Sequence, residues 1–260
     1  VPVGIVLSGG LDSSLVAAGA QEASMRAKQP VPECWTVAES EDNPDWKAAE
    51  IVASHFDLKH HQHILDPDAF DRALPNLIWH GEDLDVTVLF FQPLFETMSK
   101  HVKVGLCGQG ADELHAGYPR YRNLPGHAKL LRERLNALPS KLQHALEHGS
   151  LDETEGWLKP YHRPEETANS LSETLQFELD HGQLSNFQLR LVDRHSMAHS
   201  LEVRVPFLGR PHLECVNSLP MAWRLPPSFE EKAALREAAD LTGLPKEIVR
   251  RPKMPAGRAT

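Results

Sequence analysis

The sequence predicts an α/β fold, in which a parallel, twisted sheet with flanking helices is followed by a mainly helical C-terminal half. Up to about Tyr121, short β-branched runs alternate with helical stretches, and two of the runs lead directly into glycines. Beyond Tyr121 the patterns are helical, and no strand pattern as strong as those of the first part follows. Strands that alternate with helices of ten or more residues are typical of βαβ crossovers and of a parallel sheet covered on both faces. We therefore expect an α/β part, residues 1–121, and a mainly helical part, residues 122–260, within one continuous domain.

The alternation begins at the first residues of the chain. Residues 3–7 are a β-branched run that ends in Ser-Gly-Gly, and residues 12–28 have apolar side chains available for the buried side of a helix. Residues 31–37 are predicted to be the second strand, closed by a polar loop. Residues 46–56 again have helical spacing.

A third strand, a third helix and a fourth strand complete the first part, at residues 58–65, 67–80 and 102–107. The fourth strand is an apolar run that, like the first, leads into glycines. The carboxyl ends of parallel strands share one edge of a sheet, which is where ligands of open α/β sheets bind. We therefore expect a site where the first and fourth strands end.

The second part is predicted to be mainly helical. Its strongest pattern, residues 127–148, is amphipathic and rich in Leu, Lys and Arg. Weaker helical patterns follow at residues 170–181, 184–199, 229–242 and 245–250. The polar stretch 149–169 contains two prolines and is predicted to be a surface connection.

Composition and charge exclude several classes of protein. The chain has 260 residues, 41% of them hydrophobic, and a formal net charge of −9, which argues against a nucleic-acid-binding groove. No apolar run reaches the roughly 18–20 residues that a membrane span needs. Three widely spaced cysteines favour buried free thiols, and hence a cytoplasmic protein, over a disulfide framework. Because a strand pattern starts at once, without an initiator Met, we expect the sequence to be part of a longer protein.

The strongest chemical signal is the sequence SGGLDSS, residues 8–14, between the first strand and the first helix. Its glycines allow a sharp turn with exposed amides, the helix start adds unpaired donors, and three hydroxyls add more. Such a nest suits a phosphate or pyrophosphate group. The sequence lacks the Gly-Lys-Ser/Thr of a Walker A loop and the GxGxxG spacing of a dinucleotide fingerprint. The alternative is a plain glycine-rich turn with Asp12 as the helix N-cap.

Further blocks follow this loop in order along the chain: residues 108–118 (GQGADELHAGY), 193–208 (DRHSMAHSLEVRVPFL), 232–236 (KAALR) and 251–253 (RPK). Together with SGGLDSS, they resemble the synthetase (C-terminal) domain of B-type asparagine synthetases in the ATP pyrophosphatase group. The resemblance implies a fold of the adenine nucleotide alpha hydrolase type. It also implies an ATP-dependent ligase that adenylates a carboxylate, releases AMP and pyrophosphate and forms an amide. Asparagine made from aspartate is the leading product.

The resemblance also implies roles for individual residues. Lys253 and Gln109 would be catalytic, Arg204 would bind the substrate carboxylate, and Asp12 and Asp112 would hold Mg²⁺ on the phosphates. The residues expected to bind ATP or pyrophosphate are Ser8, Gly9, Gly10, Asp12, Ser13, Ser14, Val37, Gly108 and Lys232, with Val37 a candidate contact for adenine. Arg204 has an equal alternative as half of a buried ion pair with Glu202 or Asp193. Asp112 has an alternative as a helix N-cap, and Glu113 as a first-turn acid rather than a ligand.

Two positions depart from the family pattern. Gln109 stands where many asparagine synthetases have Glu, and an amide side chain cannot act as a base. Gly209 stands where the family usually has Asp, which puts aspartate itself in question. Two alternatives therefore stay open: an amide former on another substrate, similar to β-lactam synthetases or peptide macrocyclases, and a weakened nucleotide-binding regulatory module.

The partners expected from the resemblance are a small carboxylate and ammonia or another amine. The N-terminal glutaminase domain of the family, with its terminal Cys nucleophile, has no counterpart in these 260 residues. We therefore expect the nitrogen to come from free ammonia, or from a glutaminase domain or subunit outside them. A homodimer is left open as the oligomeric state.

Overall fold

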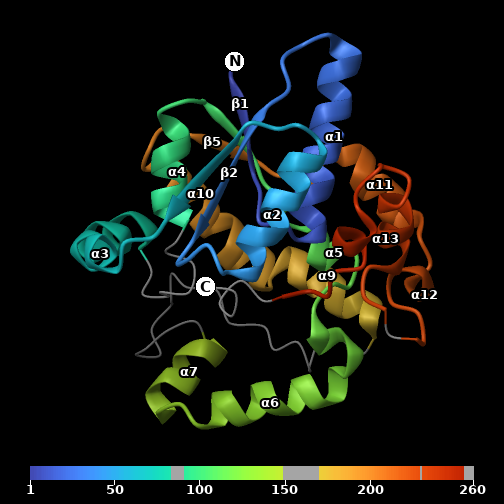
Figure 1. Ribbon diagram of the computed structural model, residues 1–260. Coiled ribbons are helices and arrows are strands. Elements are labelled where there is room, and N and C mark those ends of the chain that lie inside the picture. Colours follow the sequence, from blue (N-terminus) through green and yellow to red (C-terminus); the bar gives the residue numbers. More distant parts are fainter. Residues whose placement is uncertain (83–90, 149–169, 229, 255–260) are drawn as a thin grey trace.

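The computed structural model describes residues 1–82, 91–148, 170–228 and 230–254, and its centre is a five-stranded parallel sheet (Figure 1). The strands are β1 (Val3–Val6), β2 (Glu33–Ala38), β3 (His60–Ile64), β4 (Val104–Leu106) and β5 (Glu202–Arg204), in the order β3-β2-β1-β4-β5. Each neighbouring pair is parallel. The predicted parallel sheet with flanking helices is confirmed.

The strand order reverses beside β1. From β1 the chain moves outward to β2 and β3, and it then crosses back to β4 on the other side of β1. Gly4 of β1 is thus in register with Glu33 of β2 on one side and with Gly105 of β4 on the other. Such a reversal leaves a crevice at the carboxyl ends of the two strands, where ligands of open α/β sheets bind.

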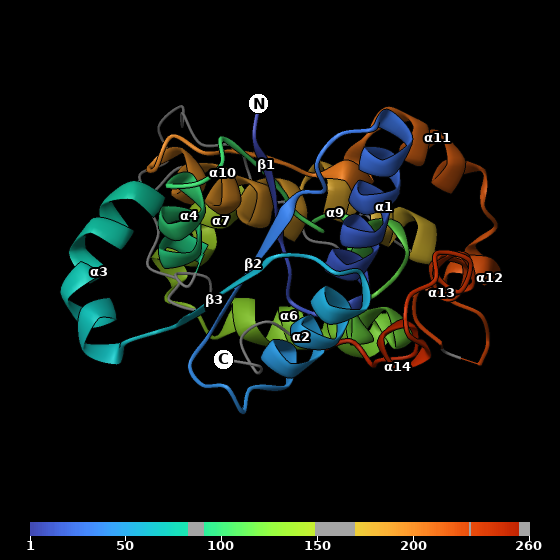
Figure 2. The same ribbon diagram turned by 45° about the horizontal axis from the view of Figure 1, so that its top comes forward.

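Helices cover both faces of the sheet, because successive side chains of a strand point to opposite faces. Ile5 packs in the cluster formed with α1 and α2, whereas the next residue, Val6, packs in the cluster formed with α4 and α10. Figure 2 shows the strands between these two groups of helices. Their bounds are α1 (Leu11–Ala27), α2 (Pro44–His55), α4 (Phe91–Ser99) and α10 (Leu189–Met197).

The elements predicted for the first part are found with small shifts at their ends, including α3 (Pro67–Gly81). The prediction of one helix at residues 127–148 is wrong. The structure has α6 (Leu124–Asn136) and α7 (Ser140–His148) instead. Pro139 separates them, because proline lacks an amide hydrogen and disfavours a helical conformation in the residue before it.

Other elements of the second part fall within predicted ranges: α9 (Leu171–Asp180), the π-helical turn η3 (Leu184–Gln188), α10, α13 (Ala233–Ala239) and α14 (Lys246–Val249). Strand β5 and several short helices were not predicted. These helices are α5 (Ala111–Leu114), η2 (Pro119–Arg122), η4 (Pro206–Leu208), α11 (Arg210–Ser218) and α12 (Met221–Arg224). The predicted connection 149–169 lies outside the described residues. Among the helices that the structure describes, none is both long and apolar enough to span a bilayer.

Candidate active site

The SGGLDSS loop folds at the carboxyl end of β1 around the side chain of Ser13. Ser13 Oγ accepts a hydrogen bond from the backbone amide of Ser8 (3.1 Å) and donates one to the carbonyl of Gly10 (3.2 Å). Helix α1 then starts at Leu11 with Gly10 as its N-cap, and no side chain in the described residues caps its amides. The unpaired amides of a helix start, with the positive end of its dipole, favour an anion at this point. Asp12 is therefore not the N-cap that the alternative interpretation required.

Gly9 lets the loop lie against helix α2. Its φ is +67°, and a Cβ at this position would stand 2.4 Å from the backbone of Ala48 and Ala49. A side chain at this position would be strained and would also collide with backbone atoms. Gly9 thus shapes the loop from behind.

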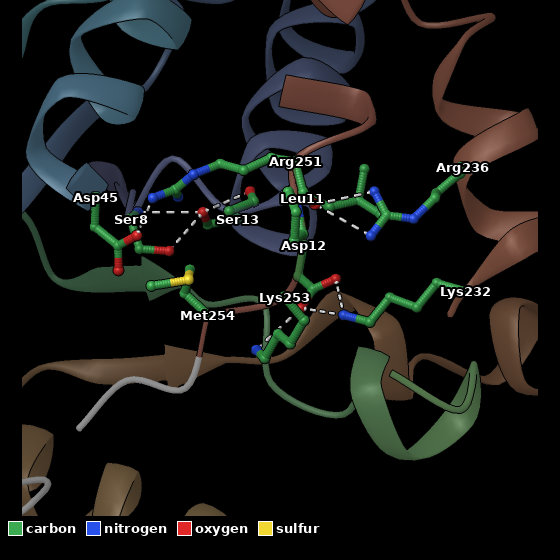
Figure 3. A pocket seen from close by; sticks show the side chains of 12 residues that line it. Ser8, Leu11, Asp12, Ser13, Asp45, Lys232, Arg236, Arg251, Lys253 and Met254 are labelled. Atoms are coloured by element: carbon green, nitrogen blue, oxygen red, sulfur yellow. Dashed lines mark hydrogen bonds and ion pairs between the residues drawn. The ribbon is translucent and has the colours of Figure 1, made fainter. Parts of the chain in front are cut away.

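Two carboxylates and two ammonium groups meet beside the loop. Lys232 Nζ lies 2.6 Å from Asp12 Oδ1 and 2.6 Å from Asp112 Oδ1. Lys253 Nζ lies 2.7 Å from Asp112 Oδ2 and 4.0 Å from Asp12 Oδ2. Figure 3 shows the two lysines pointing toward Asp12 from two different segments of the chain. We call these four residues the ion cluster.

Lys232 and Asp112 are the buried members of the ion cluster, whereas the side chains of Lys253 and Asp12 are 26% and 14% exposed. Only 2% of the Lys232 side chain and 9% of the Asp112 side chain are exposed. Burial alone would raise the pKa of Asp112, but the ammonium groups of Lys232 and Lys253 outweigh it and hold that pKa well below its usual value. Burial alone would lower the pKa of Lys253, and the carboxylates of Asp112 and Asp12 raise it instead. Asp112 and Lys253 are therefore both charged at neutral pH.

Glycines make this close approach geometrically feasible. A Cβ at Gly117 would stand 2.1 Å from both Asp112 Oδ1 and Lys232 Cε. A Cβ at Gly108 would stand 3.0 Å from the Cβ of Asp12 and from the Ser13 amide nitrogen. The end of β4 and the start of α1 can therefore touch, which brings the Asp112 segment to the loop.

Two adjoining cavities, of about 60 and 170 Å³, open beside the loop and share Ser8, Asp12 and Ser13 as lining residues. Ten predicted site residues line one or both of them: Ser8, Gly10, Asp12, Ser13, Val37, Gly108, Gln109, Asp112, Lys232 and Lys253. The structure thus brings together residues from positions 8 to 253 of the chain at one edge of the sheet. Val37 belongs to β2, the strand next to β1, as expected for a contact beside the loop.

Three predicted site residues line neither cavity: Gly9, Ser14 and Arg204. Ser14 is buried, and within the described residues its Oγ makes no hydrogen bond. Arg204 lies on the edge strand β5 with 63% of its side chain exposed, and its Nε donates to Glu202 (2.8 Å). The ion pair considered from the sequence is thus formed with Glu202, but on the surface rather than in the interior.

The two acids of the GADE sequence have different environments. Helix α5 has Gly110 as its N-cap, so Asp112 lies in the first turn and the N-cap alternative is wrong. Glu113 is fully buried, lines neither cavity and accepts a hydrogen bond from the hydroxyl of Tyr118 (2.9 Å). Burial and the neighbouring charge of Asp112 raise its pKa to about 7. Glu113 thus supports the site from the interior.

Four polar residues that were not named as site residues from the sequence complete the cavity walls. Arg251 pairs with Asp45 at 2.6 Å across the smaller cavity. Thr36 and Asn43 line the larger one. Arg251 stands in the RPK block, which was the only local signal for it. Thr36 lies within β2, and Asn43 and Asp45 follow this strand, at the carboxyl edge of the sheet where ligands of parallel sheets bind.

The two residues expected to hold a metal ion, Asp12 and Asp112, lie close together in the structure. Within the described residues, no group of three or more His, Cys, Asp or Glu side chains could hold a metal ion. Asp12 and Asp112 do converge, since oxygens of both lie 2.6 Å from one ammonium. Asp112 Oδ1 is buried and faces the ammonium of Lys232. Carboxylate oxygens of this kind suit Mg²⁺, which usually takes its other ligands from phosphates and water.

Comparison with known proteins identifies the family of the chain. Residues 1–260 match the sequence profile of the family described as asparagine synthase. The chain is 31% identical over 258 residues to the glutamine-hydrolysing asparagine synthetases of Cricetulus griseus and Mus musculus, and 30% identical over 260 residues to that of Gallus gallus. These matches cover 96% of this chain but only 38% of each relative. Because the family profile matches the whole sequence, the chain belongs to the asparagine synthase family.

Proposed function

We propose that this chain is an ATP-dependent carbon–nitrogen ligase that adenylates a carboxylate and converts it to an amide. One observation carries the proposal: the uncapped amides at the start of α1 and an ion cluster of two carboxylates and two lysines lie at two adjoining cavities beside the strand-order reversal. Activation of a carboxylate by ATP produces an acyl adenylate and pyrophosphate, both anionic. Amides, a helix start and ammonium groups are the donors that stabilise such charge.

The residues divide this work. The amides at the start of α1 bind phosphate oxygens, and Ser8 adds a hydroxyl at the cavity wall. Lys232 and Lys253 move from the carboxylates to the phosphates, where they stabilise the charge that grows as the bond between the α- and β-phosphates breaks. The substrate carboxylate oxygen forms the new bond to the α-phosphorus, and pyrophosphate leaves. An amine then attacks the acyl carbon, and AMP departs with the electron pair of the broken bond.

Asp12 and Asp112 would hold Mg²⁺ once the lysines have turned to the phosphates. Bound there, the metal would neutralise part of the phosphate charge. Two protein ligands are enough, since the phosphates and water complete the coordination of a catalytic Mg²⁺. In the free protein the two lysines balance the same two carboxylates.

Aspartate is the substrate that we propose first, because the relatives are named for asparagine synthesis. Gln109 favours a second candidate, an amide former on another carboxylate. Gln109 lines the larger cavity, where it can bind and orient a substrate by hydrogen bonds but cannot take a proton from an incoming amine. Gly209 lines neither cavity.

The source of nitrogen is a separate proposal, because the chain spans only 38% of the length of the relatives that it matches. Those relatives are named as glutamine-hydrolysing. We propose that a glutaminase domain or subunit, or free ammonia, supplies the amine to the adenylate in this cavity.

The test is production of AMP and pyrophosphate from ATP with a panel of amino acids and other carboxylates, with and without ammonium. Aspartate-dependent AMP formation, with asparagine as the product, would support the first candidate. AMP formation that ignores aspartate and follows another carboxylate would support the second. ATP binding without AMP formation across the panel would contradict the ligase proposal and leave a regulatory nucleotide-binding module.

A further inference from the structure

Arg236 is a buried arginine of α13 that lies between the two lysine-bearing segments of the ion cluster. Only 3% of the residue is exposed. It stands one helical turn after Lys232, and its backbone amide donates to the carbonyl of Lys232 (2.9 Å). Its side chain lines the smaller cavity (Figure 3). Burial of a charged guanidinium costs free energy unless hydrogen-bond partners compensate for it, so the partners of Arg236 indicate its role.

The first set of partners fixes the segment of Lys232. Arg236 Nε donates to the backbone carbonyl of Glu231 (2.9 Å), and Nη2 donates to Glu231 Oε1 (2.9 Å). The Glu231 carbonyl belongs to the peptide bond that precedes Lys232, where φ is +56°. A lysine backbone is strained in this left-handed region, so the surrounding contacts must hold it there. Arg236 is the side chain that grips the adjoining peptide.

The second set fixes the segment of Lys253. Nη1 and Nη2 of Arg236 both donate to the carbonyl of Arg251 at 3.1 Å, and Nη1 also donates to the carbonyl of Val249. Glu231 Oε1, already bound to Arg236, accepts the backbone amide of Lys253 as well (3.3 Å). One guanidinium therefore contacts both segments that deliver a lysine to the ion cluster.

We propose that Arg236 is a positioning residue that sets both lysines, Lys232 and Lys253, at the phosphates. The role rests on the proposed function, because it acts through lysines that serve ATP chemistry. The planar guanidinium has five donors in a fixed fork, which lets it bind three carbonyls and a carboxylate at once. A lysine at the same position would keep the charge and lose the fork. Arg236→Lys therefore separates geometry from charge.

The experiment compares Arg236→Lys with Arg250→Lys in the full chain. Arg250 is a matched control: it lies next to the same segment, half-exposed, and its side chain pairs with Glu230, Glu237 and Asp240 on the surface. The first readout is hydrogen exchange of the backbone amides of Arg251 and Lys253, measured without nucleotide. The second is kcat and KM for ATP in the AMP-forming reaction.

For Arg236→Lys we expect faster exchange of the Arg251 and Lys253 amides, with unchanged exchange in the sheet. We also expect a fall in kcat of about 100-fold, because displacement of catalytic groups by about 1 Å costs this much, with a smaller change in KM. Arg250→Lys should match the wild type in both readouts. If Arg236→Lys does not fold, Glu231→Gln takes its place in the exchange experiment. This variant weakens the same contacts but keeps the arginine, and it should also make the exchange faster.

The proposal would be overturned by wild-type exchange of the Arg251 and Lys253 amides in both Arg236→Lys and Glu231→Gln. A kcat within threefold of wild type in Arg236→Lys would also overturn it. The exchange readout needs no substrate, so it separates this failure from that of the proposed function. If the wild type makes no AMP with any carboxylate, the ligase proposal fails, and the exchange data alone decide whether Arg236 holds the two segments.

Discussion

Replacing Lys232 by methionine removes the central cation of the ion cluster. Its Nζ lies 2.6 Å from an oxygen of Asp12 and 2.6 Å from an oxygen of Asp112, and the side chain is 2% exposed. Methionine has a similar length and no charge. Loss of one partner of a buried ion pair leaves an uncompensated charge and costs about 3–5 kcal/mol. Lys253 stays 2.7 Å from Asp112, so we expect a loss near the lower end, about 3 kcal/mol at pH 7.

The pH dependence gives this prediction its sign. In the wild type the pKa of Asp112 lies well below the usual value of 3.8, so its stabilising contribution is present above that pH and is lost as the pH falls further. In Lys232→Met only the ammonium of Lys253 is left to oppose the effect of burial, so the pKa of Asp112 rises. The carboxyl then takes up its proton at a higher pH than in the wild type. The stability difference between the two proteins should therefore narrow from pH 7 toward pH 4.

Urea unfolding of both proteins at pH 7 and pH 4 measures this difference. The control is Lys59→Met, which removes an exposed pair with Glu33 at 2.9 Å and should cost no more than about 1 kcal/mol. A Lys232→Met protein within about 1 kcal/mol of the wild type at pH 7, or a difference that does not narrow on acidification, would refute the reasoning.

Three further predictions follow from single residues. Gly9→Ala should lower the free energy of unfolding by about 1–3 kcal/mol, since φ is +67° at this position. Gly19→Ala is the control, because a Cβ at Gly19 would meet no other atom within 4 Å, and it should not lower the free energy of unfolding. Thermal unfolding measures both variants. The pKa of Glu113 is about 7 in the folded protein and 4.5 for an unperturbed glutamate. The free energy of unfolding of the wild type should therefore fall by up to about 3 kcal/mol as the pH rises from 4.5 to 7. Glu113→Gln, which can still accept from Tyr118, should not show this slope in urea unfolding across that range. Lys253→Ala should abolish pyrophosphate release with an unchanged circular dichroism spectrum, and unchanged turnover would remove Lys253 from the mechanism.

Most of the sheet could be predicted because its signals are local. β1 and β4 are short apolar runs that end at glycines, and the helices after them have their own periodicity. β5 could not be found in this way. It has three residues, Glu202–Arg204, with both of its charged residues exposed, and within the described strands it pairs only with β4. An edge strand of this kind is specified by its neighbour rather than by its own pattern.

The residues of the candidate site also differ in whether a local sequence signal predicts them. The SGGLDSS loop is contiguous, so its amides and hydroxyls could be predicted as an anion site from seven residues. Lys232 meets Asp12 across 220 positions of the chain, and neither residue has a local signal for the other. Taken alone, Lys232 and Lys253 have the appearance of surface charges, and only motif resemblance placed them in the site. Arg204 shows the converse, since the same resemblance gave it a role while the fold leaves it exposed beside Glu202.

A crystal structure of the chain with ATP and Mg²⁺ tests the central claim most directly. We predict phosphates against the amides at the start of α1, with the ammonium groups of Lys232 and Lys253 on phosphate oxygens instead of at their present 2.6 and 2.7 Å from the carboxylates. Nucleotide bound elsewhere, with the loop empty and both lysines still paired to Asp12 and Asp112, would contradict it.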